Sequence, residues 1–509
     1  MSGCLSVQRE KRRVENVQMY IDGQWTGGAS GKTFDTVDPS TGEVIASVPS
    51  GDAQDIDRAV RAARKAQAAW QATDAFARGG SLRALSALVM QQAEDIAFLE
   101  ALDSGHYYGK ALDLTYATTL WLDYHAGLAD KYGGRTISVP GNRMSFTILE
   151  PLGVTGHIVP WNYPLLVLLR SVAPALAMGN TVVVKPAEET PLTAVKFAEL
   201  CEEAGIPDGV VNVVTGLGPD AGAPLASHPD VAGITFTGSV STGKLVAKMA
   251  ADHIGNINLE LGGKSPNIVF PDARLDDAVE CAMQGFLSHA GQVCIAGSRL
   301  FLHRDIHDQF LERLLDRVSR VTIGDPFDPS TDMGPLVSAE QLERVENYVA
   351  IGKEEGAKLL YGGGRPDGVN PGGYYVEPTV FGNVDNSMRI AQEEIFGPVV
   401  AIIPWSDEQE MLDMANDSIF GLYAAIWTQD ITKALNTAKR LEAGGVIIND
   451  WFGEVPHAPH GGHKQSGVNR EEGLETIHSY TQVKHVCINL DERLTEGPGR
   501  APNWADAPL

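Results

Sequence analysis

The chain has 509 residues, with 40 lysines and arginines against 65 aspartates and glutamates, so its formal charge is −25. This acidic balance disfavours nucleic acids and anionic membrane surfaces as partners, because both would repel the chain, and we expect neither to bind. Hydrophobic residues make up 43% and charged residues 21%, which is typical of a globular protein with about two to four folding units.

The cysteines are few, odd in number and scattered, which indicates free thiols rather than disulfides or a metal site built from a Cys-x-x-Cys motif. The basic residues near the N-terminus precede no apolar core of a signal peptide. The most apolar stretch, 164–178, contains Arg170 and is shorter than the ~20 residues that span a bilayer. We therefore expect a cytoplasmic protein.

Helix and strand patterns alternate along the chain. A helical period marks residues 56–70, and a second run at the same period covers 82–99. Short β-branched runs follow, each succeeded by a helix-like segment, at 181–184, 210–214, 233–237 and 268–270. Buried strands interleaved with helices predict an α/β fold with a mainly parallel sheet covered on both faces.

A second alternating series begins near residue 257, so we expect two α/β lobes that join there. Its predicted helices and strands are 276–289, 299–303, 306–318, 339–353, 399–404 and 446–449. Two segments break the pattern: a hairpin at 136–150 and a strand at 479–490. Each could serve either an oligomer contact or a local flap. The Pro-, Gly- and Ala-rich tail after residue 491 is expected to be loosely ordered.

Two loops have the character of nucleotide contacts. Residues 238–244 follow a strand pattern and open a helix, where glycines let a phosphate approach the backbone N–H groups. The spacing nearly fits a phosphate loop, but Leu245 replaces the hydroxyl that binds Mg²⁺, which disfavours a nucleotide-phosphate hydrolase. Residues 185–190 follow the predicted strand at 181–184, and an acidic residue at such a strand end can bind the hydroxyls of a ribose. The alternative for residues 238–244 is an ordinary tight turn, and the alternative for residues 185–190 is an ordinary polar loop.

Three further residues suggest chemistry. Cys294 lies between two glycines, where backbone dipoles can favour a thiolate, although an inert buried cysteine is the alternative. Glu260 stands between two leucines before a Gly-Gly pair, which suits a desolvated general base or a salt bridge to Lys264. Asn162 lies between two prolines and can donate to an oxyanion, or simply form a turn.

Seven segments taken together resemble the aldehyde dehydrogenase family, in that family's order and across residues 20–490. They are PWNYP (160–164), KPAEETP (185–191), FTGSVSTG (236–243), LELGGKSP (259–266), GQVC (291–294), EEIFGPV (393–399) and PHGGHKQSG (459–467).

The resemblance implies a reaction in which an aldehyde becomes a carboxylic acid. Cys294 would attack the carbonyl to give a thiohemiacetal, and the Asn162 amide with the Cys294 backbone N–H would hold the oxyanion. Hydride transfer would leave a thioester, and Glu260 would activate the water that hydrolyses it. Branches of the family that pass the acyl group to coenzyme A typically lack this glutamate, so the resemblance favours the hydrolytic, non-acylating branch.

The resemblance also implies NAD as the cofactor and requires no metal. Glu188 can bond both hydroxyls of a ribose but would repel a 2′-phosphate, which favours NAD over NADP. The residues implied in cofactor binding are Lys185 and Glu188 at the adenosine ribose, Gly238, Ser239 and Gly243 at the pyrophosphate, Glu394 and Phe396 at the nicotinamide ribose, and Trp161.

The family's architecture implies a Rossmann-like dinucleotide-binding domain, an α/β catalytic domain and a small β oligomerisation segment that makes a homodimer or homotetramer. The corresponding residues are 1–128 and 152–257 for the dinucleotide-binding domain, 258–474 for the catalytic domain, 129–151 and 475–495 for the oligomerisation segment, and 496–509 for a tail.

The substrate pocket departs from the family pattern. Ser288 stands where betaine and aminoaldehyde enzymes often carry a tryptophan, although PHGG resembles the aminoaldehyde branch. Arg170 lies in an apolar helix and must be paired, either with a substrate carboxylate, as in semialdehyde enzymes, or with an internal acid, which we favour. The residues expected at the pocket mouth are Tyr163, Arg170, Glu454, His457 and His460. Because this mouth is polar, we expect a polar aldehyde.

Overall fold

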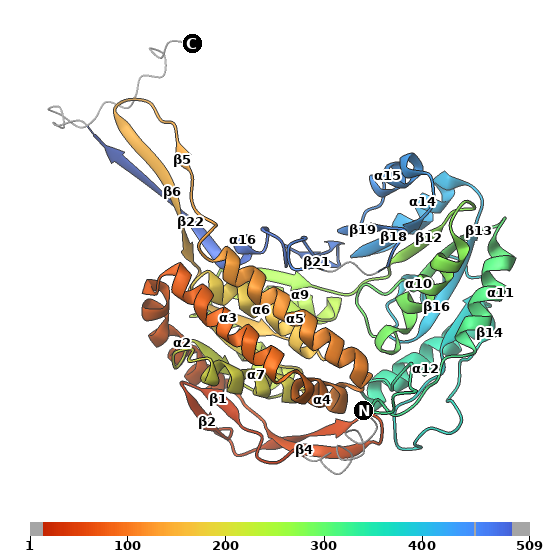
Figure 1. The fold of residues 1–509 in the computed structure, drawn as a ribbon, viewed down its shortest axis with the longest axis horizontal. Coiled ribbons are helices and arrows are strands. Elements are labelled where there is room, and N and C mark those ends of the chain that lie inside the picture. The colour runs from red at the N-terminus through yellow and green to blue at the C-terminus, as the bar shows by residue number, and fades with distance from the viewer. Residues whose placement is uncertain (1–13, 452–454, 491–509) are drawn as a thin grey trace.

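The computed structural model describes residues 14–451 and 455–490. Each of two lobes is built around its own sheet, and a long antiparallel arm projects away from both (Figure 1). The α/β architecture expected from the sequence is the one observed. No helix in the described residues is both long and apolar enough to cross a bilayer.

The first lobe contains an eight-stranded mixed sheet. Its strands, in spatial order, are β2 (Gln24–Thr26), β1 (Met19–Ile21), β9 (Val211–Val213), β8 (Thr181–Lys185), β7 (Val154–Ile158), β10 (Gly233–Thr237), β11 (Asn256–Glu260) and β21 (Gly467–Val468). The five strands from β9 to β11 are parallel, and the outer strands are antiparallel. Its helices are α2 (Ala53–Ala72), α3 (Ala75–Gln91), α4 (Ala93–Ser104), α5 (Tyr108–Leu128), α6 (Pro164–Ala177), α7 (Leu192–Glu203), the π-helical turn η2 (Gly218–Gly222), α8 (Ala223–Ala226) and α9 (Val240–Ala251).

Strand β8 shows why this sheet is covered on both faces. Its valines are fully buried and alternate between two cores. Val182 and Val184 pack in the core that includes α6 and α7, whereas Val183 packs in the core that includes α2 and α9. A run of consecutive apolar residues is what a parallel strand between two helical layers needs.

The second lobe contains a seven-stranded sheet that is parallel except for β14. Its strands, in spatial order, are β14 (Lys358–Tyr361), β15 (Thr379–Gly382), β16 (Val399–Trp405), β13 (Arg299–His303), β12 (Pro266–Val269), β18 (Tyr423–Trp427) and β19 (Gly445–Ile448). Its helices are α10 (Leu275–Leu287), the 3₁₀ turn η3 (Ser288–Gly291), α11 (His307–Val318), α12 (Ala339–Glu354), α13 (Arg389–Gln392), α14 (Glu408–Asn416) and α15 (Ile431–Ala438).

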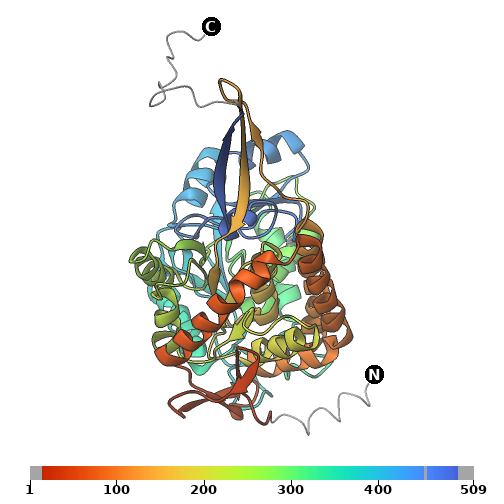
Figure 2. The same cartoon turned by 90° about the vertical axis from the view of Figure 1, so that its left-hand side faces the viewer.

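The arm consists of β5 (Thr136–Ile137), β6 (Arg143–Pro151) and β22 (Thr481–Asn489), and it projects away from both lobes in Figure 1. In the perpendicular view of Figure 2 it points toward the viewer, in front of the second lobe. The hairpin and the strand expected from the sequence thus pair with one another, from Thr481↔Pro151 to Asn489↔Arg143. Short α16 (Ile477–Tyr480) leads into the arm. Two small pairs complete the fold: β3 (Thr33–Asp38) with β4 (Glu43–Pro49), and β17 (Phe420–Gly421) with β20 (His463–Lys464).

Two expectations about boundaries are wrong. The helical run at 82–99 is two helices, because Gln92 leaves the helical conformation at φ −106° and ψ 20° while the apolar period continues past it. The junction near residue 257 falls inside β11, all of which belongs to the first sheet. Moreover, β21 returns to pair with β11, through Leu259↔Val468, so the range 258–474 does not form one separate lobe.

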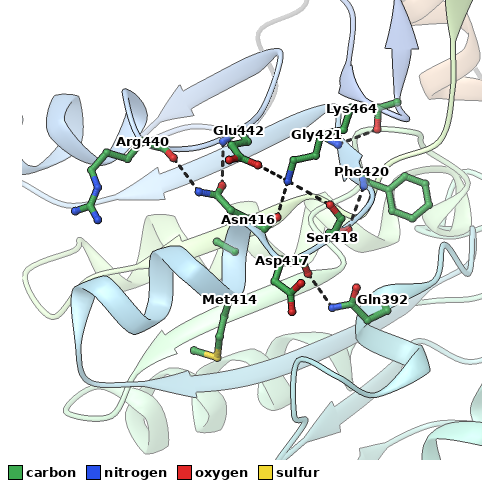
Figure 3. A network of polar contacts seen from close by, with 12 residues as sticks. Gln392, Met414, Asn416, Asp417, Ser418, Phe420, Gly421, Arg440, Glu442 and Lys464 are labelled. Carbon is green, nitrogen blue, oxygen red and sulfur yellow. Dashed lines mark hydrogen bonds and ion pairs between the residues drawn. The ribbon is translucent and has the colours of Figure 1, made fainter.

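The returning segment is fastened to the second lobe just before β21. Lys464 forms an ion pair with Glu442 at 2.6 Å and donates to the carbonyl oxygens of Asn416 and Ser418 (Figure 3). The Asn416 side chain in turn accepts from the Glu442 backbone N–H at 2.9 Å. This network holds residues 459–468 between the two lobes, beside the end of β11.

Candidate active site

A cavity of about 690 Å³ gathers the candidate catalytic residues. Cys294, Asn162 and Glu260 all line it, although they come from segments that are widely separated in the chain. Other lining residues predicted from the sequence are Trp161, Tyr163, Arg170, Gly238, Ser239, Glu394 and Phe396. The cavity thus joins the candidate catalytic residues to part of the candidate cofactor site.

Cys294 lies in a partly exposed turn after α10 and η3. The chain reaches it through His289 and Ala290, whose φ angles of 47° and 53° are left-handed. The Cys294 carbonyl packs so closely against Gly263 that a Cβ there would clash with it. A left-handed turn at 289–290 and the close approach of Gly263 therefore fix the position of this thiol.

Asn162 lies against the loop that carries Cys294. Its side-chain amide is buried, and Nδ2 donates to the Gln292 carbonyl oxygen at 2.9 Å. Gln292 is itself held by the Val337 backbone N–H, which donates to Oε1 at 2.9 Å. An amide NH₂ has two hydrogens, so Asn162 can hold this loop and also donate into the cavity.

Glu260 ends β11 and is 2% exposed. Neither carboxylate oxygen has a hydrogen-bonding partner among the described residues. Burial, followed by the nearby charge of Glu471, raises the pKa of Glu260 well above its ordinary value, and Arg170 opposes this shift. Nε2 of His460 lies 3.8 Å from Oε2 of Glu260, whereas no ion pair joins Glu260 to Lys264 within the described residues.

Arg170 lies in the cavity wall and has the internal partner that we favoured. Its Nε donates to Oε2 of Glu471 at 2.6 Å, and Oε1 of Glu472 is 3.9 Å away. Glu472 also accepts from Nε1 of Trp121 at 2.9 Å. A substrate carboxylate that approached Arg170 would also meet the carboxylates of Glu471 and Glu472. Their repulsion disfavours a semialdehyde, which carries a carboxylate of its own.

The other expected pocket-mouth residues differ in position. Tyr163 lines the cavity, but His460 is buried behind Glu260, where its ring lies 5.5 Å from that of Tyr423, and it is not part of the lining. The prediction for His460 is therefore wrong, because β21 draws its segment against β11. Glu454 lies outside the described residues.

The candidate ribose contacts form a preorganised pair at the end of β8. Lys185 is 2% exposed, and its Nζ lies 2.6 Å from Oε2 of Glu188. Burial acts to raise the pKa of Glu188, but the charge and hydrogen bond of Lys185 together with backbone N–H groups outweigh it, so the pKa lies below the ordinary value. Neither residue lines the 690 Å³ cavity, so any contact that they make with a cofactor lies farther from Cys294.

The turn between β10 and α9 fits a phosphate. Ser239 is the N-cap of α9, its Oγ accepting from the Thr242 backbone N–H at 3.2 Å, and Gly238 beside it carries no side chain. Gly243 is on the first turn of α9, against Leu261. A helix N-terminus with open backbone N–H groups suits a pyrophosphate.

The opposite side of the cavity holds Glu394 and Phe396. Oε1 of Glu394 accepts from the Gly263 backbone N–H at 3.0 Å, and burial raises its pKa to about 7. Phe396 has a left-handed φ of 63°, and its ring meets that of Trp161 edge-on at 5.2 Å. These groups form a wall to which a ribose and a nicotinamide can bind.

Several cavity residues were missed from the sequence. On α12, Gln341 donates to the Phe396 carbonyl oxygen at 2.7 Å and Arg344 donates to that of Ile395 at 3.1 Å. The others include Leu114, Ala117, Trp121, Leu166, Val167, Thr237, Val293, Ile295, Glu340 and Val455. Most lie on ordinary amphipathic or apolar helices, whose periodicity carries no sign of a site.

Comparisons with known proteins show which family the chain resembles. The aldehyde dehydrogenase family model matches residues 25–486. Hydroxyisobutyraldehyde dehydrogenase of Mycolicibacterium austroafricanum is 58% identical, with 100% of each chain covered, and human mitochondrial aldehyde dehydrogenase is 46% identical over 94% of this chain and 92% of the other.

A crystal structure of betaine aldehyde dehydrogenase from Staphylococcus aureus in complex with NAD⁺ superimposes with a TM-score of 0.93 at 42% identity, covering 95% of this chain and 97% of that one. The family match spans most of the sequence, and the solved relative shares the fold. The chain belongs to the aldehyde dehydrogenase family.

Proposed function

We propose that the protein oxidises a neutral, polar aldehyde to the carboxylic acid with NAD as the hydride acceptor. The observation that carries this proposal is the presence of Cys294, Asn162 and Glu260 in one cavity, beside the candidate nicotinamide residues Glu394 and Phe396. When bound, NAD supplies the acceptor for the substrate's hydride. The N-cap turn at Ser239 and the Lys185–Glu188 pair provide fitting contacts for its phosphates and ribose.

The first chemical step is addition. The Cys294 thiolate forms a C–S bond to the aldehyde carbon, and the carbonyl π electrons move to oxygen. The Asn162 amide and the Cys294 backbone N–H stabilise the resulting oxyanion. Collapse of this tetrahedral species expels the hydride and re-forms the carbonyl, which leaves a thioester on Cys294.

The second step is hydrolysis. Glu260 takes a proton from water, the hydroxide adds to the thioester carbon, and the thiolate leaves with the C–S electrons. The carboxylate of Glu260 is buried and has no hydrogen-bonding partner among the described residues, which suits it to hold a water molecule. We therefore place the chain in the hydrolytic rather than the coenzyme A-dependent branch.

The cavity wall supports a neutral substrate. Leu166, Val167 and Val455 provide apolar surface, and Arg170 is compensated by Glu471 rather than left for an anion. Because the relative that is 58% identical is named a hydroxyisobutyraldehyde dehydrogenase, we propose a small hydroxylated aldehyde as the first substrate to test. Betaine aldehyde, which carries a quaternary ammonium charge, is the contrasting substrate to test, because a solved relative with the same fold is named for it, and we expect it to be oxidised more slowly than a neutral aldehyde.

We also propose a homodimer or homotetramer in the cytoplasm. The arm exposes apolar side chains that another copy can cover, including Met144 at 48% and Val483 at 64%. The cysteines within the described residues are free thiols, as expected in a reducing compartment: Cys201, Cys281, Cys294 and Cys487.

An assay of aldehydes with NAD tests the proposal. We expect NADH absorbance with at least one small polar aldehyde, and its loss in Cys294→Ser, while Cys281→Ser keeps the activity. Release of phosphate from ATP would instead support a hydrolase that uses residues 238–244. Binding of NAD without oxidation of any aldehyde would indicate a catalytically silent member of the family.

A further inference from the structure

Two buried acids on helix α4, Glu100 and Asp103, take no part in the proposed reaction. They are 2% and 0% exposed, and a spacing of three residues places them on one face of the helix. Burial raises the pKa of Glu100 to about 8, and burial, with the nearby charge of Glu100 as a smaller cause, raises the pKa of Asp103 well above its ordinary value. Burying two polar groups is costly, so their oxygens need partners that offset the cost.

Glu100 caps helix α6. The backbone N–H of Leu165, the second residue of α6, donates to the Glu100 carboxyl. A carboxyl that accepts from an N–H of the first helical turn does the work of an N-cap side chain. The N-cap residue itself is Tyr163, whose side chain makes no capping bond and lines the catalytic cavity instead. Because the cavity uses the side chain at this position, the cap comes from another helix.

Asp103 caps helix α7 in the same way. The backbone N–H of Leu192, the first residue of α7, donates to Oδ2 of Asp103 at 3.1 Å. The N-cap residue is Pro191, which has no side-chain acceptor. The last turns of α4 therefore supply acceptors to the starts of two other helices.

Each of these two helices begins where a candidate functional segment ends. Helix α6 follows residues 160–163, which carry Asn162, and α7 follows residues 185–191, which carry Lys185 and Glu188. Helix α4 also packs against α7. A bond that fixes the first turn of a helix also fixes the end of the segment that leads into it.

We propose that Glu100 and Asp103 are positioning residues, Glu100 for the oxyanion amide of Asn162 and Asp103 for the ribose contacts Lys185 and Glu188. This inference rests on the proposed function, which gives those three residues their roles. Neither acid lines the catalytic cavity, so each acts through the helix that it caps. The role requires an oxygen that accepts a hydrogen bond, and a neutral amide can replace the acid in it.

Two matched pairs of variants test the proposal. Glu100→Met and Asp103→Leu remove the acceptor at similar size, whereas Glu100→Gln and Asp103→Asn keep a carbonyl oxygen. We expect the rate of the NADH burst at saturating NAD to fall on the order of tenfold in Glu100→Met, because the oxyanion donor is displaced rather than lost, with the Kd of NAD unchanged. We expect the Kd of NAD, measured by titration calorimetry, to rise roughly tenfold in Asp103→Leu, with the burst rate retained at saturating NAD. The Gln and Asn variants should keep the values of the parent.

Hydrogen exchange followed by mass spectrometry tests the capping without use of activity. Exchange should become faster in the peptide that contains Leu165 in Glu100→Met, and in the peptide that contains Leu192 in Asp103→Leu. Glu94→Met removes an exposed acid from the same helix and should change neither peptide. Glu100→Asp withdraws the acceptor by one methylene and carries the same test if Glu100→Met does not fold.

The two effects must separate for the proposal to hold. Equal changes of burst rate and NAD affinity in Glu100→Met and Asp103→Leu, no change in either, or losses in the Gln and Asn variants as large as in the Met and Leu variants would overturn it. A parent protein that oxidises no aldehyde would refute the proposed function instead. The exchange pattern and the NAD affinity would then still decide whether the two acids position their segments.

Discussion

Arg170 and Glu471 form a buried ion pair in the wall of the catalytic cavity, with 2.6 Å between Nε and Oε2. Their side chains are 3% and 0% exposed, and 301 residues separate them in the chain. Helix α6 supplies the arginine, and the segment after β21 supplies the glutamate. The pair therefore fastens the C-terminal part of the chain to the first lobe, within reach of the charge on Glu260.

Loss of one partner of this pair is expected to destabilise the protein strongly. Arg170→Met leaves the Glu471 carboxylate buried and uncompensated, which costs about 3–5 kcal/mol. Urea unfolding measures this change. Arg61→Met is the matched control, because Arg61 and Asp57 pair at 75% and 39% exposure and contribute about 0–1 kcal/mol. Equal losses in the two variants would contradict the structural role of Arg170.

Gly461 is expected to hold the Glu260 carboxylate in place. A Cβ at this position would lie 2.7 Å from Oε1 of Glu260, and its φ of 150° also favours glycine. We predict that Gly461→Ala lowers the steady-state rate on the order of 100-fold, because a displacement of about 1 Å has that effect. The initial burst of NADH should persist, since Glu260 acts after hydride transfer.

Rapid-mixing absorbance separates the burst from the steady state in Gly461→Ala. Gly80→Ala is the control, because no atom lies within 4 Å of a Cβ added there. A steady-state rate equal to that of the unmodified protein would show that Gly461 does not position the carboxylate.

The raised pKa of Glu260 predicts a rate that increases with pH. The carboxyl must be ionised to accept a proton from water, and burial followed by Glu471 raises its pKa well above the ordinary 4.5. The rate of thioester hydrolysis should therefore fall as the pH is lowered through a midpoint well above 4.5. Glu260→Gln should lack this acid limb; a limb that survives the substitution would assign it to another group.

Glu188 should determine the choice of cofactor. A 2′-phosphate beside its carboxylate, which Lys185 keeps ionised, meets a repulsion of about 1 kcal/mol or more. We predict a preference for NAD over NADP in kcat/KM that falls roughly tenfold in Glu188→Gln. Glu199→Gln, on the exposed face of α7, should leave the ratio unchanged. An unaltered ratio in Glu188→Gln would place the ribose elsewhere.

Much of the fold could be predicted because its signals are local. The apolar runs at 181–184 and 233–237 match β8 and β10, since parallel strands between helical layers are continuously apolar. The hairpin and the strand of the arm were also visible as patterns. Gln92 was missed because a single residue can interrupt a helix without shifting the apolar period.

The site was predictable where motifs carry the chemistry and not where distant segments meet. Cys294, Asn162 and Glu260 lie in local motifs that indicate a site when the motifs are taken together, whereas the partner of Arg170 depends on how residue 471 returns to the first lobe. The same return, through β21, removes His460 from the pocket mouth. Such long-range pairing leaves no trace in spacing or composition.

The most direct test of the central claim is mass spectrometry of Glu260→Gln after mixing with a substrate aldehyde and NAD. We predict an acyl group on Cys294 and a burst of about one NADH per chain, because attack and hydride transfer proceed while hydrolysis stalls. NADH formation without an adduct, or an adduct on Cys281 in place of Cys294, would contradict the convergence of the thiol, the amide and the carboxylate on one carbonyl.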